Sequence, residues 1–278
     1  MKLAAVVVFY FPSEDNINHI NKYLKEVDRL YVIDNSDDDV IRIKYKDKIN
    51  YIKYGENKGI AFALNDGAHQ AINDSYEWLL TLDQDSKITV ENISDIKNFI
   101  KTTKEKNIGL VAPFQDIGLP YQKSNSEYEE YIELMTSGSV LNLDAYKKIG
   151  GFKDWLFIDC VDTDYCLNLH KNKYQVLRLN NVIMKHSLGE LKLHKFLGKT
   201  YDCFNHNPIR RYYIVRNNLY INEMYHDLCP DYCDHLIRAQ KGQAKRILLF
   251  EKNKIKKLRM MLKGYRDYKK GVKGRISE

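Results

Sequence analysis

Two acidic residues, separated by a single residue, stand directly after the apolar run Leu79–Leu82. They are Asp83 and Asp85, with Gln84 between them. Carboxylate oxygens suit Mg²⁺ or Mn²⁺, and a bound diphosphate would supply further oxygen ligands. A divalent cation held there would neutralise the charge of a leaving diphosphate. The alternative is a solvated turn, because Asp is a common turn residue.

Asp34 follows the apolar run Leu30–Ile33 in the same way, and small polar residues come after it. Its carboxylate could accept a hydrogen bond from the imide of a pyrimidine base, or it could close the strand as an Asx turn. Further along, Gly59 and the alanines after it would let a helix pack closely on a sheet, with its N-terminal amides facing a nucleotide. The alternative there is an ordinary helix start capped by Asn57.

Asp162 and Asp164 open a predicted helix after the apolar run Trp155–Ile158. A carboxylate at this place could act as a general base that removes the proton of an acceptor hydroxyl. Acidic residues in a first helical turn also complement the helix dipole, which is the structural alternative.

His186, Arg211 and Arg216 come later in the chain. His186 follows a short predicted strand, and the two arginines lie in a helical segment rich in Arg and Tyr. Imidazole suits Mn²⁺ better than Mg²⁺, so His186 could be a third metal ligand or a phosphate ligand; a structural histidine is the alternative. The guanidinium groups could hold phosphate or an anionic acceptor, unless the helix is purely structural.

Apolar, β-branched runs alternate with helical patterns as far as Pro113 and must position these groups. The pattern predicts strands at Leu3–Phe9, Leu30–Ile33, Tyr51–Ile52, Trp78–Leu82 and Leu110–Pro113, and helices at Glu14–Val27, Ile60–Ile72 and Val90–Lys101. Such alternation favours an α/β fold with a mostly parallel sheet and helices on both faces. Ligands of such sheets sit beyond the carboxyl ends of the strands. Residues 114–131 are polar and predict a loop, and helices are expected near Asp144–Ile149, from Asp162 and from Asn207.

The charge of the chain is unevenly distributed. Residues 236–278 carry 15 Lys and Arg but 3 Asp and Glu, out of 44 and 37 in the 278-residue chain. We therefore expect a catalytic domain at 1–225 and a basic helical extension at 226–278. A uniformly basic nucleic-acid-binding domain would not show this division, so no nucleic-acid partner is expected.

A basic amphipathic tail is typical of a membrane-surface element. Its apolar stripe is expected to comprise Ile247, Phe250, Leu258, Met261, Leu262 and Tyr265. The alternative is a helix packed on its own domain or on a second subunit. Because no apolar run could span a bilayer and the N-terminal strand is too short for a signal peptide, we expect a cytoplasmic protein, peripheral on the inner face of the cell membrane.

The order of these segments resembles the inverting family 2 glycosyltransferases with the GT-A fold, in particular their bacterial rhamnosyltransferase-like branch. The likeness covers roughly residues 3–220. Asn57 to Gly67 repeats the family's Asn-x-Gly-x-Ala-x-Ala-x-Asn-x-Gly pattern. The other segments that carry it are Tyr10-Phe11-Pro12, Val32–Ser36, Leu82–Ser86, Phe157–Leu169, His186–Gly189 and Arg211–Asn217.

The resemblance implies a role for each matching residue. Asp34 would read the base of the donor, Asp83 would contact the ribose or the metal, and Asp85 would be the main ligand of Mn²⁺ or Mg²⁺. Asp162 would be the general base, with Asp164 as the alternative, because Val161 stands where many relatives have Glu. His186 would lie near the diphosphate or the metal. Further donor contacts are implied at Phe9, Tyr10, Phe11, Asn57, Gly59, Gln84, Arg211 and Arg216.

The implied reaction is a one-step displacement with inversion at the anomeric carbon. The donor would be a nucleotide-diphosphate sugar, with L-rhamnose from dTDP-rhamnose as first choice and UDP-galactose or UDP-glucose as alternatives. The acceptor would be a saccharide or lipid-linked saccharide in bacterial surface polysaccharide synthesis. Two rivals are a nucleotidyltransferase and a non-catalytic membrane- or nucleic-acid-binding module. The first would need a Gly-rich basic loop after the first strand, where this chain has the acidic segment Tyr10–Asp15. The oligomeric state stays open.

Overall fold

A computed structural model describes residues 1–37, 47–118, 121, 124–185, 192–196 and 198–277. The chain forms two compact units. The first comprises Met1–Phe157 and Asp162–His186, and the second comprises Ile158–Val161 and Ser187–Glu278. Four residues that lie between two parts of the first unit in sequence therefore belong to the second.

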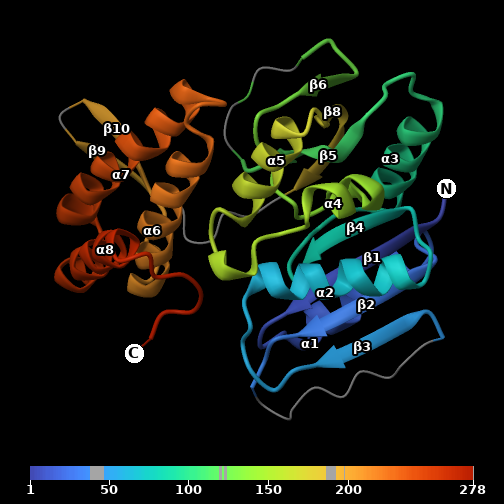
Figure 1. Cartoon of the computed structure of the whole chain (residues 1–278), viewed down its shortest axis with the longest axis horizontal. Helices are drawn as coiled ribbons and strands as arrows, with labels where there is room; N and C mark the ends of the chain where they lie inside the picture. Colours follow the sequence, from blue (N-terminus) through green and yellow to red (C-terminus); the bar gives the residue numbers. More distant parts are fainter. Residues whose placement is uncertain (38–46, 119–120, 122–123, 186–191, 197, 278) are drawn as a thin grey trace. The chain divides into compact units, whose positions relative to one another are not determined.

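The first unit is built on an eight-stranded mixed sheet in the described part of the chain (Figure 1). Its strand order is β3-β2-β1-β4-β7-β5-β8-β6. Parallel pairs join β2 to β3, β1 to both β2 and β4, and β5 to β8, whereas β6 and β7 pair antiparallel with their neighbours. The strands are β1 (Leu3–Phe9), β2 (Arg29–Asp34), β3 (Ile49–Lys53), β4 (Trp78–Asp83), β5 (Ile108–Asp116), β6 (Tyr128–Glu130), β7 (Val140–Asn142) and β8 (Gln175–Lys185).

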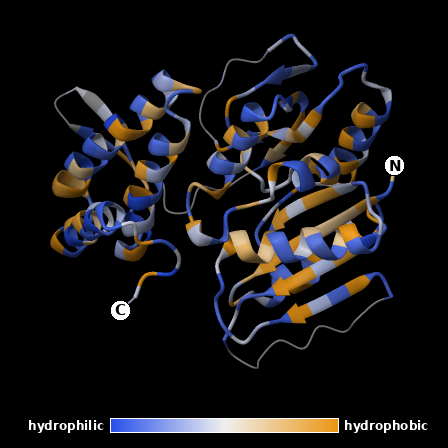
Figure 2. Ribbon diagram, in the orientation of Figure 1, coloured by the Kyte–Doolittle hydropathy of each residue, from blue (hydrophilic) through white to orange (hydrophobic). Residues whose placement is uncertain are grey.

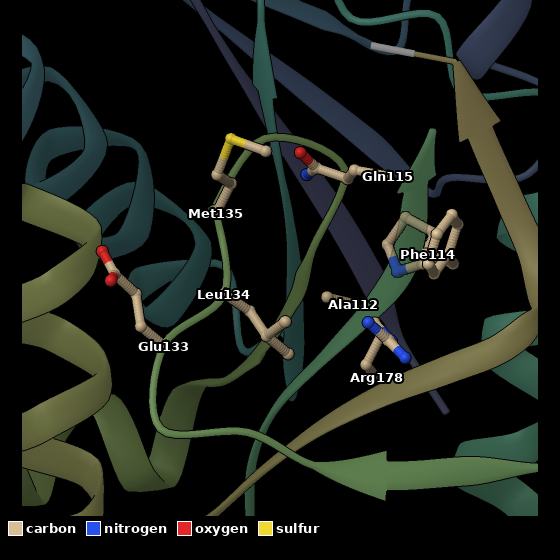
Figure 3. Close-up of a pocket in the computed structure, with 8 residues that line it drawn as sticks. Ala112, Phe114, Gln115, Glu133, Leu134, Met135 and Arg178 are labelled. Carbon is tan, nitrogen blue, oxygen red and sulfur yellow. The ribbon is translucent and has the colours of Figure 1, made fainter. Parts of the chain in front are cut away.

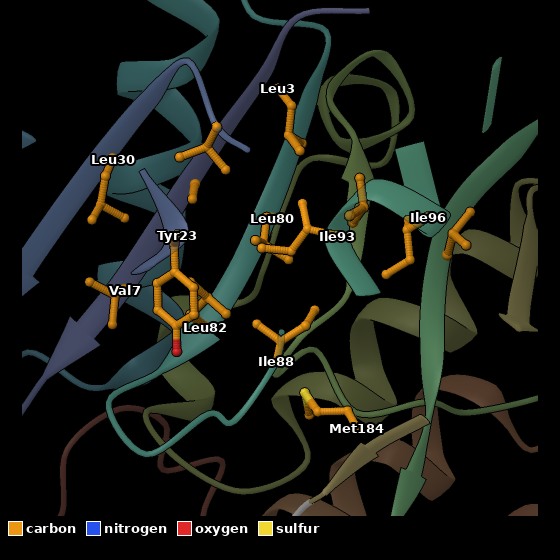
Figure 4. Close-up of a cluster of buried hydrophobic side chains, with 14 of the residues drawn as sticks. Leu3, Val7, Tyr23, Leu30, Leu80, Leu82, Ile88, Ile93, Ile96 and Met184 are labelled. Carbon is orange, nitrogen blue, oxygen red and sulfur yellow. The ribbon is translucent and has the colours of Figure 1, made fainter. Parts of the chain in front are cut away.

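Helices cover both faces of this sheet, which explains why β1 is buried along its whole length. On one face, α1 (Glu14–Tyr23) and α3 (Val90–Thr102) pack on Leu3, Val7, Leu80 and Leu82, as Figure 4 shows. The other face carries α2 (Ile60–Asn73), α4 (Leu143–Ile149) and α5 (Val161–Lys171). Strand β1, near the middle of the sheet, is a continuous hydrophobic run (Figure 2).

Small residues of α2 allow it to approach the sheet closely. A Cβ atom at Gly67 would lie 2.3 Å from Val6 Cγ2, so only glycine fits there. Asn65, on the same helix, donates to the carbonyl of Phe152 at 2.8 Å and accepts from Tyr146 Oη at 2.6 Å. The repeated Asn and Gly positions of this segment are therefore packing residues that lock α2 in place.

The predicted strands and helices are confirmed, with two corrections. Helix α1 ends at Tyr23 and not at Val27, because the carbonyl of Tyr23 accepts from Glu26 and Val27 in a tight turn toward β2. The predicted loop at 114–131 is wrong at both ends. Strand β5 runs on to Asp116, and β6 pairs with β8 through Tyr128–Glu130.

The second unit is helical, with α6 (Pro208–Tyr225), α7 (Pro230–Phe250) and α8 (Lys254–Lys269), plus a hairpin of β9 (Lys192–Phe196) and β10 (Lys199–Cys203). Helices α6 and α8 pack closely, since a Cβ at Gly264 would lie 2.5 Å from the carbonyl oxygen of Tyr212. Thus α6 belongs with α7 and α8 by packing, while the predicted division at 225 stays a prediction. Among the described residues, no helix is long and apolar enough to cross a bilayer.

Candidate active site

The loop after β4 brings the paired aspartates to the carboxyl edge of the sheet. Ser86 closes this loop, because its hydroxyl accepts from Asp83 N at 2.8 Å and its own amide donates to Asp83 O at 3.1 Å. Asp83 is half-buried and Asp85 is exposed. Across β1, Val8 pairs with Asp83 and Phe9 pairs with Asp34. Two strand spacings separate the backbones of Asp34 and Asp83, on the order of 10 Å.

Hydrogen bonds tie the loops after β1, β2 and β4 to one another. Gln84 Oε1 accepts from Tyr10 N at 2.9 Å, and Ser36 Oγ accepts from Phe11 N at 2.8 Å. Tyr10 and Phe11 are each 48% exposed, and their rings make an edge-to-face contact. Two aromatic faces are therefore held at the edge of the sheet where a planar base could stack.

Asp34 lies beneath this surface and is fully buried. Its Oδ2 accepts from Tyr51 Oη at 2.5 Å and its Oδ1 accepts from Ser36 N at 2.9 Å. Both oxygens thus organise the loop after β2. The predicted contact of Asp34 with the donor base stays a prediction.

Asn57 and Gly59 shape the entry into α2. Asn57 Oδ1 accepts from Gly59 N at 2.9 Å, which is a bond within the loop itself. Gly59 has φ of 91°, and a Cβ there would lie 2.6 Å from the carbonyl oxygen of Phe157. The same carbonyl accepts from Ile60 N at 2.8 Å. Glycine is therefore needed both for the backbone angle and for the close approach of Phe157.

Asp162 lies in the first turn of α5. It is the candidate base whose pKa is strongly raised. Thr136 Oγ1 donates to its Oδ1 at 2.5 Å. Burial of the carboxyl group is the main cause that raises the pKa of Asp162 to about 7. The Thr136 hydrogen bond opposes this shift, and the nearby charges of Asp83 and Glu133 contribute to it. A carboxylate with this pKa is a competent general base near neutral pH.

Asp164 has a different environment, although it is only two residues away. It is fully buried, and Lys153 Nζ lies 2.7 and 2.9 Å from its two oxygens. This carboxylate is balanced by an ammonium group, so it fits a structural role. The geometry therefore favours Asp162 over Asp164 as the base.

The segment Thr136–Ser139 joins the loop after β4 to Asp162, a connection that the sequence did not reveal. Ser137 Oγ lies 2.6 Å from Ser86 Oγ, and Gly138 N donates to Thr81 O at 2.7 Å. Thr136, which donates to Asp162, is itself held through its carbonyl, which accepts from Thr81 Oγ1 at 2.5 Å. The available signal was the run of small polar residues between two apolar segments.

A pocket of about 360 Å³ opens beside this segment. Figure 3 shows Glu133 and Leu134 on one side and Phe114 and Arg178 on the other, with Gln115 above them. Gln115 Nε2 donates to Ser137 O at 2.7 Å, while its buried Oε1 has no hydrogen-bond partner among the described residues. A few polar groups in a mostly apolar lining are typical of a small-molecule site.

Comparison with known proteins decides the family. The family model described as "Glycosyl transferase family 2" matches residues 14–160, more than half of the chain. The chain is a family 2 glycosyltransferase. Membership favours the transferase over the nucleotidyltransferase and the non-catalytic module that were its rivals.

Relatives of this glycosyltransferase agree with the predicted branch and fold. It is 29% identical over 231 residues to the dTDP-rhamnosyl transferase RfbF of Shigella flexneri, covering 77% of each chain. Staphylococcus aureus TarS 1-349 superposes with a TM-score of 0.62 at 17% identity, over 96% of this chain and 81% of that one. GalNAc-T7 with UDP, GalNAc and Mn²⁺ gives 0.61 at 13% identity, over 84% and 49%. These structures confirm the α/β GT-A fold.

The transferase's β4 loop fits a divalent cation by its donor chemistry. Asp83 and Asp85 offer oxygen ligands, and the carboxylate of Asp83 lies near enough to Asp162 to affect its pKa. In the described part of the chain, no three His, Cys, Asp or Glu side chains form a ready-made metal group. Oxygens of a bound diphosphate would complete the coordination. His186 lies outside the described residues, so its predicted role is untested.

Arg211 and Arg216 are buried within the second unit. Arg211 is 2% exposed, and its Nη2 donates to Glu251 Oε1 at 2.7 Å. Arg216 Nη1 donates to the carbonyl of Gly274 at 2.6 Å, and its guanidinium lies over the ring of Tyr213. These contacts give both arginines a structural role. Their predicted contact with donor phosphate has no support in this geometry and stays untested.

Proposed function

We propose that this transferase is an inverting, metal-dependent hexosyltransferase that moves L-rhamnose from dTDP-rhamnose to a saccharide or lipid-linked saccharide acceptor. The product would enter a bacterial surface polysaccharide such as O-antigen or capsule. The likeness to a dTDP-rhamnosyl transferase supports this donor. The observation that carries the proposal is the carboxyl group of Asp162, which has a pKa of about 7 and lies near Asp83.

In the proposed reaction, Asp162 accepts the proton of the attacking acceptor hydroxyl as the new glycosidic bond forms. Attack from the face opposite the leaving diphosphate inverts the anomeric carbon in one step, so no covalent intermediate with the enzyme forms. Thr136 holds the carboxylate in place, and Asp83 with Asp85 would hold Mn²⁺ or Mg²⁺. When bound, the cation would neutralise the leaving diphosphate. Tyr10, Phe11 and Gln84 would hold the nucleotide.

UDP-hexoses such as UDP-galactose and UDP-glucose remain the alternative donors. Structural neighbours support this alternative, because TarS 1-349 was solved with UDP-GlcNAc and GalNAc-T7 with UDP. The test is a panel of dTDP-rhamnose and these UDP-hexoses, with and without Mn²⁺. We expect dTDP-rhamnose with Mn²⁺ to raise the melting temperature most and to release dTDP when an acceptor is present. Turnover of a UDP-hexose alone would select the alternative, and no response to any donor would contradict the proposal.

We also propose that the extension 226–278 binds the anionic inner face of the cell membrane, where lipid-linked acceptors lie. Lys257 and Gly264 mark the buried side of α8. At 100° per residue, Ile255 and Leu262 fall on the opposite side, and both are exposed. Arg259 and Arg266 lie beside them in the helix. Ile247 of the predicted stripe is instead buried in α7, because it packs inside the unit.

Vesicle flotation tests this membrane contact. The full chain should float with vesicles that contain an anionic lipid and stay behind with neutral ones. Replacing Ile255 and Leu262 with Glu should abolish flotation, whereas Leu193→Glu, at an exposed apolar residue of β9, should not. Binding that ignores lipid charge would count against the proposal, and a loss of dimers in the double variant would point to a second subunit.

A further inference from the structure

The segment Phe157–Cys160 has an unusual backbone immediately before the candidate base. Phe157, Asp159 and Cys160 have φ of 66°, 62° and 61°, although none of them is glycine. L residues rarely adopt the left-handed region, and a cluster of them persists only when surrounding contacts hold it. The segment must therefore be held by contacts with its surroundings.

One end of the segment is held within the first unit. The carbonyl of Phe157 accepts from Ile60 N at 2.8 Å, and the missing Cβ of Gly59 leaves room for it. The rest of the segment, Ile158–Val161, belongs to the second unit. Its partners there lie on α6.

Asn217 and Arg210 are these partners. Asn217 is fully buried, and its Nδ2 donates to two successive carbonyls, Ile158 O at 2.8 Å and Asp159 O at 2.9 Å. Arg210 Nη2 lies 2.6 Å from Asp159 Oδ1, and its Nε reaches the same carboxylate at 3.3 Å. Cys160 Sγ adds a contact of 3.4 Å to Asn218 Oδ1. One amide and one guanidinium thus fix both the backbone and the side chain of the strained stretch.

Val161 begins α5 directly after this stretch, and Asp162 is the next residue. The stretch Ile158–Cys160 therefore leads straight into the first turn of α5, where Asp162 lies. We propose that Asn217 and Arg210 are positioning residues for the base: they hold the left-handed segment so that Asp162 meets the acceptor hydroxyl. This inference rests on the proposed function, because it assumes that Asp162 is the base.

Kinetics of the full-length enzyme with dTDP-rhamnose and Mn²⁺ test the proposal. Asn217→Ala should lower kcat by about tenfold to a hundredfold while the donor KM changes less than about twofold, since a small misplacement of a base affects the chemical step. Arg210→Ala should lower kcat less, and Arg210→Lys should recover part of the loss. Arg246→Ala, which removes another arginine paired to an aspartate of this unit, is the matched control and should leave kcat unchanged. Equal kcat in Asn217→Ala and wild type would overturn the proposal.

A double variant separates positioning from general structural damage. If Asn217 acts through Asp162, then Asn217→Ala should cost no further activity in an Asp162→Asn background. A further loss of the same size as in the wild-type background would mean that Asn217 acts elsewhere. Full activity of Asp162→Asn alone would refute the proposed base itself, which is a different failure.

Amide hydrogen exchange tests, without any substrate, whether Asn217 and Arg210 stabilise this segment. Amides of residues 158–164 should exchange at least about tenfold faster in Asn217→Ala and Arg210→Ala than in wild type, and at the wild-type rate in Arg246→Ala. Unchanged exchange in both variants would overturn the proposal. Arg210 is 42% exposed at the surface, so its variants should fold even if Asn217→Ala does not.

Discussion

Each unit contains a cluster of ionisable side chains, but the charge of the two clusters is balanced differently. One cluster lies at the carboxyl edge of the sheet in the first unit, and the other is buried in the second unit. Asp83 and Asp162 lie near each other at this edge, where burial and, to a smaller extent, the charge of Asp83 raise the pKa of Asp162 to about 7. In the second unit, Glu251 lies between Arg211 at 2.7 Å and Lys257 at 2.8 Å, all nearly inaccessible to solvent. Charge left unbalanced at a sheet edge suits a ligand, whereas charge balanced in the interior holds a fold.

The sharpest way to break this comparison is to remove the candidate base. Asp162→Asn keeps the size of the side chain but cannot accept the acceptor proton, so turnover should fall at least about a hundredfold. Donor affinity, measured by calorimetry, should stay within about twofold because the change acts on the chemical step. Near-normal turnover in the purified variant would move the role of base to another residue.

Removal of Asp85, the proposed metal ligand, should be almost as damaging. Asp85→Ala should cut turnover by about a hundredfold, because the leaving diphosphate loses its cation. The melting temperature without ligand should not fall, since Asp85 is exposed. Donor-induced stabilisation in Mn²⁺ is the measurement. The control is Asp95→Ala, which removes an acidic residue from α3. Equal stabilisation by donor in Asp85→Ala and wild type would contradict a metal role for Asp85.

The pH dependence should reflect the raised pKa of Asp162. Turnover should rise about tenfold per pH unit on the acidic side and level off above about pH 7, where the carboxyl group of Asp162 has lost its proton. The folded pKa lies above the unfolded value, so the stability that the neutral carboxyl contributes is lost as pH rises through about 7. Melting curves of the metal-free enzyme between pH 5 and pH 9 check this, and Asp162→Asn should flatten the trend. A melting temperature that rises with pH across this range would contradict the expected loss of stability.

The smallest effect on turnover is expected in the second unit. Arg211→Met should change turnover and donor affinity of the folded enzyme by less than about twofold. It should instead lower the free energy of unfolding by about 3 kcal/mol, because Glu251 loses one of its two buried partners. Denaturant unfolding measures the free energy of unfolding, and calorimetry measures donor affinity. Glu251→Gln should have the same effects as Arg211→Met. A tenfold loss of donor affinity would restore the predicted phosphate contact of Arg211.

Sequence patterns predicted the central strands of the sheet well because these strands are buried on both faces. The run Leu3–Phe9 is apolar throughout and forms β1 with the predicted bounds. The length of α1 was overestimated, since the turn after Tyr23 depends on how Val27 and Asp28 meet β1 and not on helical periodicity. Local patterns therefore predict elements more accurately than they predict where elements end.

Site residues were predictable as types but not as environments. Asp162 and Asp164 are two positions apart in the sequence, yet Thr136 contacts one and Lys153 the other. Both partners lie outside α5, so the local pattern of the helix could not assign the role of base. The same applies to Arg211 and Arg216, whose burial depends on α8 and the residues after it. The role of Asn217 was hidden because its partners are backbone carbonyls, which leave no sequence signal.

The four residues of Ile158–Val161 also limit how this enzyme can be rebuilt. Because they pack with α6 while Asp162 belongs to the sheet unit, a graft of the C-terminal helices from a relative would have to include this short insert. A chimaera joined only after β8 would pair a foreign α6 with the native insert and lose the Asn217 and Arg210 contacts. Domain exchange in this enzyme therefore needs three splice points: one before Ile158, one after Val161 and one after β8.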